Sequence, residues 1–357
     1  MMCSCYYARE RLNKGEIMRI YGNHIPADTK GAQRLSVERL KKWQALEFGM
    51  FIHFGIATYN LDLPNLKPSD YCPPRPVDTD QWARVARDAG MKYIIFTTQH
   101  GNSFTMWETS MPGLPHAGQS AQPQDVVRSF VDSCRHYDIV PCFYYSQSRF
   151  CPWAGEFRQH REPANNHLTR VGLDCVKRQL DELLTGYGPI GELWIDGPIA
   201  YGQGGRCELY DHATALQPDM VFAFNGWGED RWRLPRFHSP SGWPSDIQVL
   251  EVLLPPFGEV SPWRAMDIDR HGKVLNKPVD MYIPVECCQV MHRNQLDWYN
   301  DPDAVQVSNA ELLGMRLIAR ERQANLILNV TPDASTRIPE EQVAALMGLR
   351  KNFEAEG

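Results

Sequence analysis

The chain has 357 residues, a length that suits one α/β barrel better than one small domain. Its composition is 43% apolar and 22% charged, which is ordinary for a soluble globular protein. The net charge of −6 leaves no basic footprint, so neither nucleic acid nor a membrane is an expected partner. No stretch reaches transmembrane length, and residues 1–10 lack the apolar run of a signal peptide. The ten scattered cysteines therefore indicate reduced thiols in a cytoplasmic protein.

In chain order, the sequence alternates between strand-like and helix-like segments. Residues 1–35 are polar and irregular and predict an N-terminal arm, followed by a single catalytic domain over 36–357. Apolar runs predict strands over 48–55, 92–100, 139–146, 193–196, 220–226, 279–288 and 324–330. Helices are predicted over 37–46, 80–89, 125–137, 168–187, 207–216, 310–320 and 339–353. Residues 227–280, rich in Trp and Pro, are predicted to be irregular.

Repeated strand-then-helix units predict a parallel sheet. Seven or eight strands, with terminal elements that complete the set, favour an α/β fold of the (β/α)8 TIM-like barrel type over an open doubly wound sheet. No glycine-rich phosphate turn follows the first strand, which argues against a dinucleotide site. The chain also lacks a P-loop and a Gly-x-Ser-x-Gly elbow.

Polar or aromatic residues close most of the predicted strands. Because the carboxyl ends of parallel strands share one rim, these side chains are expected to surround one ligand. Asp196, followed by Gly197, ends the strand on which the site is centred, although such an Asp taken alone more often caps a helix or starts a turn. The expected rim set is His53, His100, Tyr144 or Tyr145, Asp196, Asn225, Glu286 and Asn329.

Two carboxylates among histidines and aromatic rings suit glycoside cleavage. One carboxylate attacks or stabilises the anomeric carbon, and the other handles the proton of the leaving group. The competing interpretation is structural, because every barrel of this size has polar rim residues. No Cys/His spacing is typical of a zinc site, so neither a metal nor a cofactor is expected.

Several segments resemble the signatures of glycoside hydrolase family 29, the α-L-fucosidases. They are 48–55, 89–93 with 97–100, 144–146, 183–190 leading into Trp194-Ile195-Asp196-Gly197, and 325–333. The resemblance runs from about Trp43 to about Leu349. It implies a retaining exo-glycosidase that cleaves terminal fucose from oligosaccharides or glycoconjugates, with Asp196 as nucleophile. Residues 283–287, with Trp298 beyond them, resemble the branch that prefers α-1,3/4 linkages, and no C-terminal β-sandwich is expected.

Two departures from that family pattern change the expectations. The family usually has two adjacent histidines after its second strand, whereas this chain has His100-Gly101, so a different L-configured or 6-deoxy sugar stays open as substrate. The α-1,3/4 branch commonly has a Glu acid/base after an Arg-Trp pair, but no Glu follows Arg231-Trp232 directly. A sugar-binding barrel without catalysis is therefore a third hypothesis.

Glu286 is the first candidate for the acid/base, because it is predicted to end a strand. Glu229 and Glu251 are the further candidates, in segments predicted as loops. Glu286 is equally open to a substrate-orienting or a purely structural role. The acid needs a raised pKa, which an aromatic and partly dry pocket provides.

The remaining site residues are expected to bind the sugar. His53 and His100 are predicted to form hydrogen bonds with its hydroxyl groups, and Tyr145 and Trp298 to supply apolar walls. The expected partner is a carbohydrate substrate. The sequence leaves the linkage, the aglycone and the oligomeric state open, a homo-oligomer included.

Overall fold

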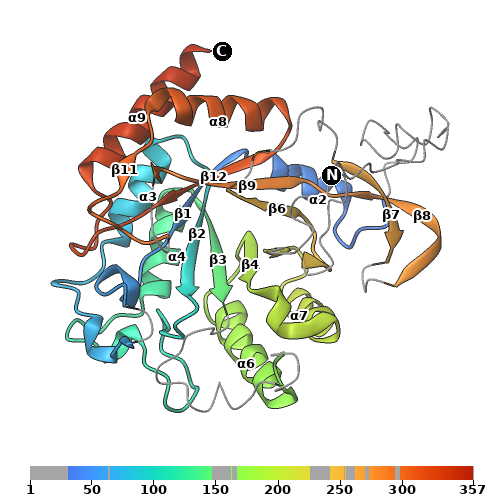
Figure 1. Cartoon of the computed structure of the whole chain (residues 1–357), viewed down its shortest axis with the longest axis horizontal. Helices are drawn as coiled ribbons and strands as arrows, with labels where there is room; N and C mark the ends of the chain where they lie inside the picture. Colours follow the sequence, from blue (N-terminus) through green and yellow to red (C-terminus); the bar gives the residue numbers. More distant parts are fainter. Residues whose placement is uncertain are drawn as a thin grey trace, which may run out of the picture.

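The computed structural model describes residues 31–62, 65–146, 162, 167–225, 242–252, 254, 262–269, 273–293 and 298–356 (Figure 1). Eight parallel strands form one sheet in the order β5-β4-β3-β2-β1-β12-β9-β6. They are β1 (Phe48–Ile52), β2 (Tyr93–Gln99), β3 (Val140–Ser146), β4 (Glu192–Asp196), β5 (Val221–Phe224), β6 (Gln248–Glu251), β9 (Val285–Val290) and β12 (Asn325–Val330).

The two edge strands, β5 and β6, approach one another and nearly close the sheet. Asp246, just before β6, donates its backbone N–H to the Phe222 carbonyl at 2.9 Å, and its carboxylate accepts the Phe222 N–H at 2.9 Å. The result is a nearly closed parallel barrel, which confirms the predicted (β/α)8-type fold.

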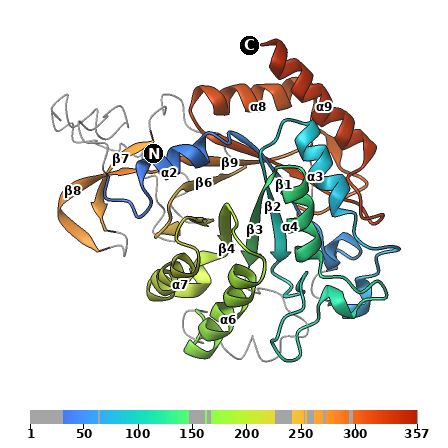
Figure 2. The same cartoon turned by 180° about the vertical axis from the view of Figure 1, so that it is seen from behind.

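Helices cover the outside of the barrel (Figures 1 and 2). They are α3 (Thr79–Asp88), α4 (Val126–His136), α6 (Arg170–Gly186), α7 (Gly202–Leu216), α8 (Asn309–Glu321) and α9 (Glu340–Ala355). Asp78, Asp125, Thr169 and Ser308 cap four of them by accepting a backbone N–H of the first turn. Short 3-10 turns are η1 (Ile56–Thr58), η3 (Pro68–Asp70), η4 (Ala117–Gln119) and η5 (Pro198–Tyr201).

One end of the barrel is closed by α2 (Val37–Gln44), which lies over the N-terminal ends of the strands. The Trp43 indole donates to Glu192 at the start of β4, and Asn325 at the start of β12 donates to the Trp43 carbonyl. We call this the closed end, and the opposite end, where the strands finish, the open end. The predicted arm over 1–35 lies mostly outside the described residues. In its described part, Arg34 donates to the Pro218 carbonyl and pairs with Asp246.

Two departures from the predicted elements move residues that matter for function. The strand predicted over 279–288 is divided at Pro284: β8 (Val274–Tyr282) pairs with β7 (Trp263–Ile268) in an antiparallel hairpin beside the barrel, and β9 begins at Val285 (Figure 2). The second is β6, which lies inside the segment predicted to be irregular. Its four residues are too few for a recognisable alternation.

Side chains alternate between the barrel interior and the helix layer along each strand. On β4, Glu192, Trp194 and Asp196 share the interior face, whereas Leu193 and Ile195 belong to the apolar layer beneath the helices. A further two-stranded pair is β10 (His292–Arg293) with β11 (Val305–Gln306). Among the described residues, no helix is long and apolar enough to cross a membrane.

Candidate active site

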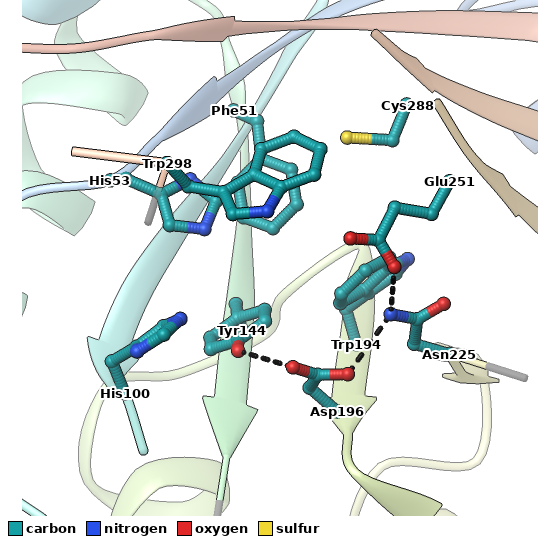
Figure 3. A pocket seen from close by; sticks show the side chains of 10 residues that line it. All are labelled: Phe51, His53, His100, Tyr144, Trp194, Asp196, Asn225, Glu251, Cys288 and Trp298. Atoms are coloured by element: carbon teal, nitrogen blue, oxygen red, sulfur yellow. Dashed lines mark hydrogen bonds between the residues drawn. The ribbon is translucent and has the colours of Figure 1, made fainter. Parts of the chain in front are cut away.

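A pocket of about 240 Å³ lies at the open end of the barrel (Figure 3). Among the described residues, its lining is Phe51, His53, His100, Tyr144, Trp194, Asp196, Asn225, Glu251, Cys288 and Trp298. The predicted residues Asp196, His53, His100 and Trp298 meet there.

Asp196 ends β4 and points into the pocket, where three donors hold its carboxylate (Figure 3). The Tyr144 hydroxyl donates to Oδ2 at 2.8 Å, and the Asn225 amide and the Gly197 backbone N–H donate to Oδ1 at 2.9 and 2.8 Å. Gly197 adopts a left-handed backbone with φ of 64°, which favours glycine at the turn after the strand. The three donors thus hold the Asp196 carboxyl group in one orientation at the pocket wall.

Glu251, the last residue of β6, is the second carboxylate of the pocket. The same Asn225 nitrogen that donates to Asp196 also donates to Glu251 Oε2 at 2.7 Å. One amide nitrogen therefore bridges both groups, as the dashed lines of Figure 3 show. The shared donor brings the two carboxylates close together, and retaining glycosidases keep their two carboxyl groups closer, at about 5–5.5 Å, than inverting enzymes do.

His53 is a neutral acceptor at the pocket wall. Burial, followed by the neighbouring His100, holds the pKa of His53 well below its ordinary value. Its Nδ1 lies 2.7 Å from Asn329 Oδ1, and the Asn329 amide nitrogen donates to the Trp298 carbonyl at 2.9 Å. Because that bond turns the amide oxygen toward His53, Nδ1 carries the proton. Nε2 is left as an acceptor for a ligand hydroxyl.

Aromatic stacking holds the other rings of the pocket. The Tyr144 ring stacks on His100 at 5.4 Å and 11°, and on Trp194 at 5.4 Å and 29°. Trp298 stacks on His53 at 5.5 Å and 28°. Burial and the adjacent Asp196 raise the pKa of Tyr144 well above its usual value, so its hydroxyl remains a donor.

Tyr145 does not line the pocket, contrary to prediction. Its side chain is buried in the helix layer, and its hydroxyl donates to Gln179 of α6 at 2.7 Å. Neighbouring residues on a strand face opposite sides, so only one of Tyr144 and Tyr145 can face the barrel interior. Tyr144 is that residue.

Glu286 is also absent from the pocket lining. It is the second residue of β9, so it lies at the closed end, paired in register with Asn325 at the start of β12. Its exposure is 0%, and it accepts the Tyr93 hydroxyl at 2.7 Å. The expectation failed because the strand begins at Val285 and does not end near Glu286. Glu229, the other candidate, lies outside the described residues.

Glu286 and Glu192 form a buried carboxyl pair at the closed end. Burial raises the pKa of Glu286 to about 7, and burial together with Glu286 raises the pKa of Glu192 well above its usual value. The Trp43 indole donates to Glu192 at 3.0 Å. Two buried carboxyls side by side cannot both ionise cheaply, so the pair retains a proton near neutral pH.

The sequence also missed three apolar lining residues, Phe51, Trp194 and Cys288. A signal was present, because Phe51 and Trp194 stand two residues before His53 and Asp196 and so share their face. Cys288 stands two residues after Glu286 and shares its strand face. The strand was predicted to end at Cys288 with Glu286 near the rim, whereas β9 continues to Val290, so Cys288 was missed. Burial and the nearby Glu251 raise the pKa of its thiol well above the usual value.

The family model described as α-L-fucosidase matches residues 64–357. The chain belongs to the α-L-fucosidase family. α-L-Fucosidase 1 of Arabidopsis thaliana is 24% identical over 320 residues, which cover 85% of this chain and 57% of that protein. The chain thus spans little more than half the length of this curated relative.

Solved fucosidase structures share the fold. α-L-Fucosidase isoenzyme 1 from Paenibacillus thiaminolyticus gives a TM-score of 0.63 at 24% identity, covering 90% of this chain and 76% of that one. An α-L-fucosidase from Lactobacillus casei in complex with α-L-fucose product gives 0.66 at 16% identity, covering 89% of this chain and 99% of that one.

Tyr144 and Tyr145 provide a matched test of the pocket. Tyr144→Phe removes a donor to the Asp196 carboxylate, and hydrogen bonds to charged groups contribute about 1.5–3 kcal/mol, so kcat/KM on a fucoside should fall about tenfold or more. Tyr145→Phe should leave kcat/KM close to wild type and lower the free energy of unfolding by about 1 kcal/mol. Equal losses of kcat/KM in both variants would contradict this geometry.

The buried pair predicts a pH-dependent stability. The pKa of Glu286 in the folded protein is raised from 4.5 to about 7. Its protonated form therefore contributes stability that is fully present below about pH 4.5 and is lost as the pH rises through about 7. The associated loss is roughly 3 kcal/mol. Calorimetry between about pH 5 and pH 8 should show Tm falling with pH in the wild type, and less steeply in Glu192→Gln.

Glu182→Gln is the control for that experiment, because Glu182 also accepts an indole N–H, from Trp107 at 2.7 Å, but lies outside the pair. It should leave the slope of Tm against pH unchanged. A Glu192→Gln slope identical to wild type would refute the shared-proton description.

Proposed function

We propose that the protein is an exo-acting, retaining α-L-fucosidase with Asp196 as nucleophile and Glu251 as acid/base. The observation that carries this proposal is the single Asn225 amide that bridges the two carboxylates. Glu251 takes the role first expected for Glu286, since Glu251 lines the pocket and Glu286 does not.

The reaction follows from the positions of the two acids. Asp196 attacks the anomeric carbon while Glu251 gives its proton to the departing glycosidic oxygen, leaving a covalent glycosyl-enzyme. Glu251 then takes a proton from water, which hydrolyses the intermediate with net retention. Tyr144 and Asn225 hold the Asp196 carboxylate in place throughout both steps.

A 6-deoxy sugar suits the composition of the pocket. His53 and His100 offer ring nitrogens for hydroxyl groups, and His53 Nε2 accepts. On another side, Phe51, Cys288 and Trp298 form an apolar surface (Figure 3). A methyl group gains from contact with such a surface, whereas a hydroxymethyl group would leave its hydroxyl unpaired there.

The natural substrate is proposed to be a terminal fucose on an oligosaccharide or glycoconjugate. Exo action is what the resemblance to the family implies. The resemblance of residues 283–287 and Trp298 to the α-1,3/4 branch supports a preference for those linkages. The other glycosidase considered, acting on a different L-configured or 6-deoxy sugar, rests on Gly101.

The response to added azide distinguishes the nucleophile from the acid/base. Asp196→Ala should lower kcat by about 10³-fold or more, and azide should restore turnover with the inverted glycosyl azide as product, since it replaces the nucleophile. Glu251→Ala should still form the glycosyl-enzyme from substrates with good leaving groups, and azide should give the retained glycosyl azide.

Glu286→Gln is the matched control, because its carboxyl lies at the closed end of the barrel. Azide should not raise its activity. Retained azide product from Glu286→Gln but not from Glu251→Ala would return the acid/base role to Glu286. Substantial turnover by Asp196→Ala without azide would refute the nucleophile assignment.

Gly101 predicts a shift in substrate preference. A glycine at this position cannot provide the hydrogen bond that the second histidine of the family gives, so a simple aryl α-L-fucoside should be a poor substrate. Fucosylated oligosaccharides with α-1,3/4 linkages should give the higher kcat/KM, and Gly101→His should improve the aryl substrate about tenfold. An aryl fucoside hydrolysed by the wild type at about 10⁵ M⁻¹s⁻¹ would show that Gly101 has no such effect.

A further inference from the structure

Within the part of the chain that the structure describes, three buried polar atoms near the closed end of the barrel lack a conventional hydrogen-bond partner. They are Glu192 Oε1, Glu286 Oε2 and Trp194 Nε1. The two carboxyls interact with one another, and the Trp194 indole interacts with Glu286. Two ionised carboxylates cannot bond to each other, but one proton makes a donor of one and leaves the other as acceptor. A shared proton therefore provides a hydrogen bond for both unpartnered oxygens, Glu192 Oε1 and Glu286 Oε2.

Trp194 connects this pair to the pocket. Glu192, Trp194 and Asp196 lie on one face of β4, so the indole lies between the closed end and the proposed nucleophile. At the open end its ring lines the pocket and stacks on Tyr144, the donor to Asp196. Any movement of the indole thus reaches the groups that contact the sugar.

Neighbouring side chains fix the positions of the Glu192 and Glu286 carboxyl groups. Gly49 on β1 leaves room for the Tyr93 ring, since a Cβ there would lie 2.6 Å from ring carbons. The Tyr93 hydroxyl, so placed, donates to Glu286 Oε1 at 2.7 Å. On the other side Trp43 of α2 donates to Glu192 Oε2. Each carboxyl thus has one oxygen fixed by a donor and one turned toward the shared proton.

We propose that Glu192 and Glu286 are positioning residues of the active site, sharing one proton at the closed end and holding the Trp194 indole against the pocket. The proposal rests on the proposed fucosidase function of that pocket. Ionisation of Glu286 places one charge beneath Trp194 while Glu192 keeps its proton, and it changes the contact between the Glu286 carboxylate and the indole N–H. The pair thereby makes the shape of the pocket depend on pH, separately from the ionisation of Glu251.

The titratable groups around the pair reinforce proton retention. Tyr93 acts from β2, Cys142 from β3, Asp246 from the segment before β6, and Cys287 and Cys288 from β9. These phenol, thiol and carboxyl groups are neutral or negative. The charge of Asp246 is matched by Arg34, with which it forms an ion pair.

The direct test follows the indole N–H of Trp194 by NMR in protein carrying ¹⁵N-labelled tryptophan, with the resonance assigned by Trp194→Phe. In the wild type this resonance should shift between about pH 5 and pH 8, as Glu286 ionises and Glu192 keeps the shared proton. Glu286→Gln keeps the shape of the side chain but cannot ionise, so it should abolish the shift. Glu192→Gln removes the carboxyl group whose hydrogen bond lowers the pKa of Glu286, so it should move the midpoint to higher pH.

The Trp107 resonance is the matched control, because Trp107 donates to Glu182, a carboxylate outside the pair. Glu286→Gln should leave it unchanged. An identical Trp194 titration in wild type and Glu286→Gln would overturn the proposal. If Glu286→Gln fails to fold, Glu192→Gln decides alone: a raised midpoint supports the pair, and an unchanged or lowered midpoint refutes it.

Kinetics on a fucoside then separate positioning from mere stability. Introduced alone, Glu286→Gln should lower kcat/KM about threefold or more. In a Trp194→Phe background it should lower kcat/KM much less, because Glu286 acts on the pocket by positioning the Trp194 indole. Equal effects in both backgrounds would indicate a purely structural role and would overturn the proposal. A wild type without turnover would refute the fucosidase function, whereas the NMR titration would still decide the role of the pair.

Discussion

The two-residue alternation of β4 is the constraint on which the site depends. A strand buried on both faces sends every second side chain into the barrel, so Glu192, Trp194 and Asp196 follow one another from the closed end to the open end. At a rise of about 3.3 Å per residue, the two carboxyls of this strand are separated by roughly 13 Å. One strand therefore carries both a buried acid that holds a proton and the proposed nucleophile.

The environment at each end determines what a carboxyl group does. Asp196 meets three donors in a partly open pocket, and these fix the orientation of its carboxyl group. Glu286 meets one phenol, another carboxyl and no solvent, and burial raises its pKa to about 7. The same functional group is suited to nucleophilic attack in the first setting and to holding a proton in the second.

Strained backbone also contributes to the open end. Val252, directly after Glu251, has φ of 54°, and Trp298 has φ of 65°, a region that side chains other than glycine rarely adopt. Each costs of order 1–3 kcal/mol and persists because neighbouring groups hold it. The Val252 N–H donates to the Cys288 carbonyl, and the Trp298 carbonyl accepts from Asn329. These hydrogen bonds hold the backbone beside Glu251 and at Trp298, and both of these residues line the pocket.

The sequence by itself determined the barrel, because its apolar runs and helix caps are local signals, and it placed Asp196, His53 and His100 at one rim since each closely follows or ends a clear strand. It could not locate the proposed acid/base, Glu251. Residues 248–251 are too short to show a period, and Pro284 divides what reads as one apolar run, so Glu251 looked like a loop residue and Glu286 like a strand end.

Only the tertiary structure fixed the strand register, and a shift in where a parallel strand begins moves a residue from one end of the barrel to the other. For that reason the partners of each carboxylate, Asn225 at the open end and Tyr93 at the closed end, were decided by long-range packing and not by any pattern in the chain.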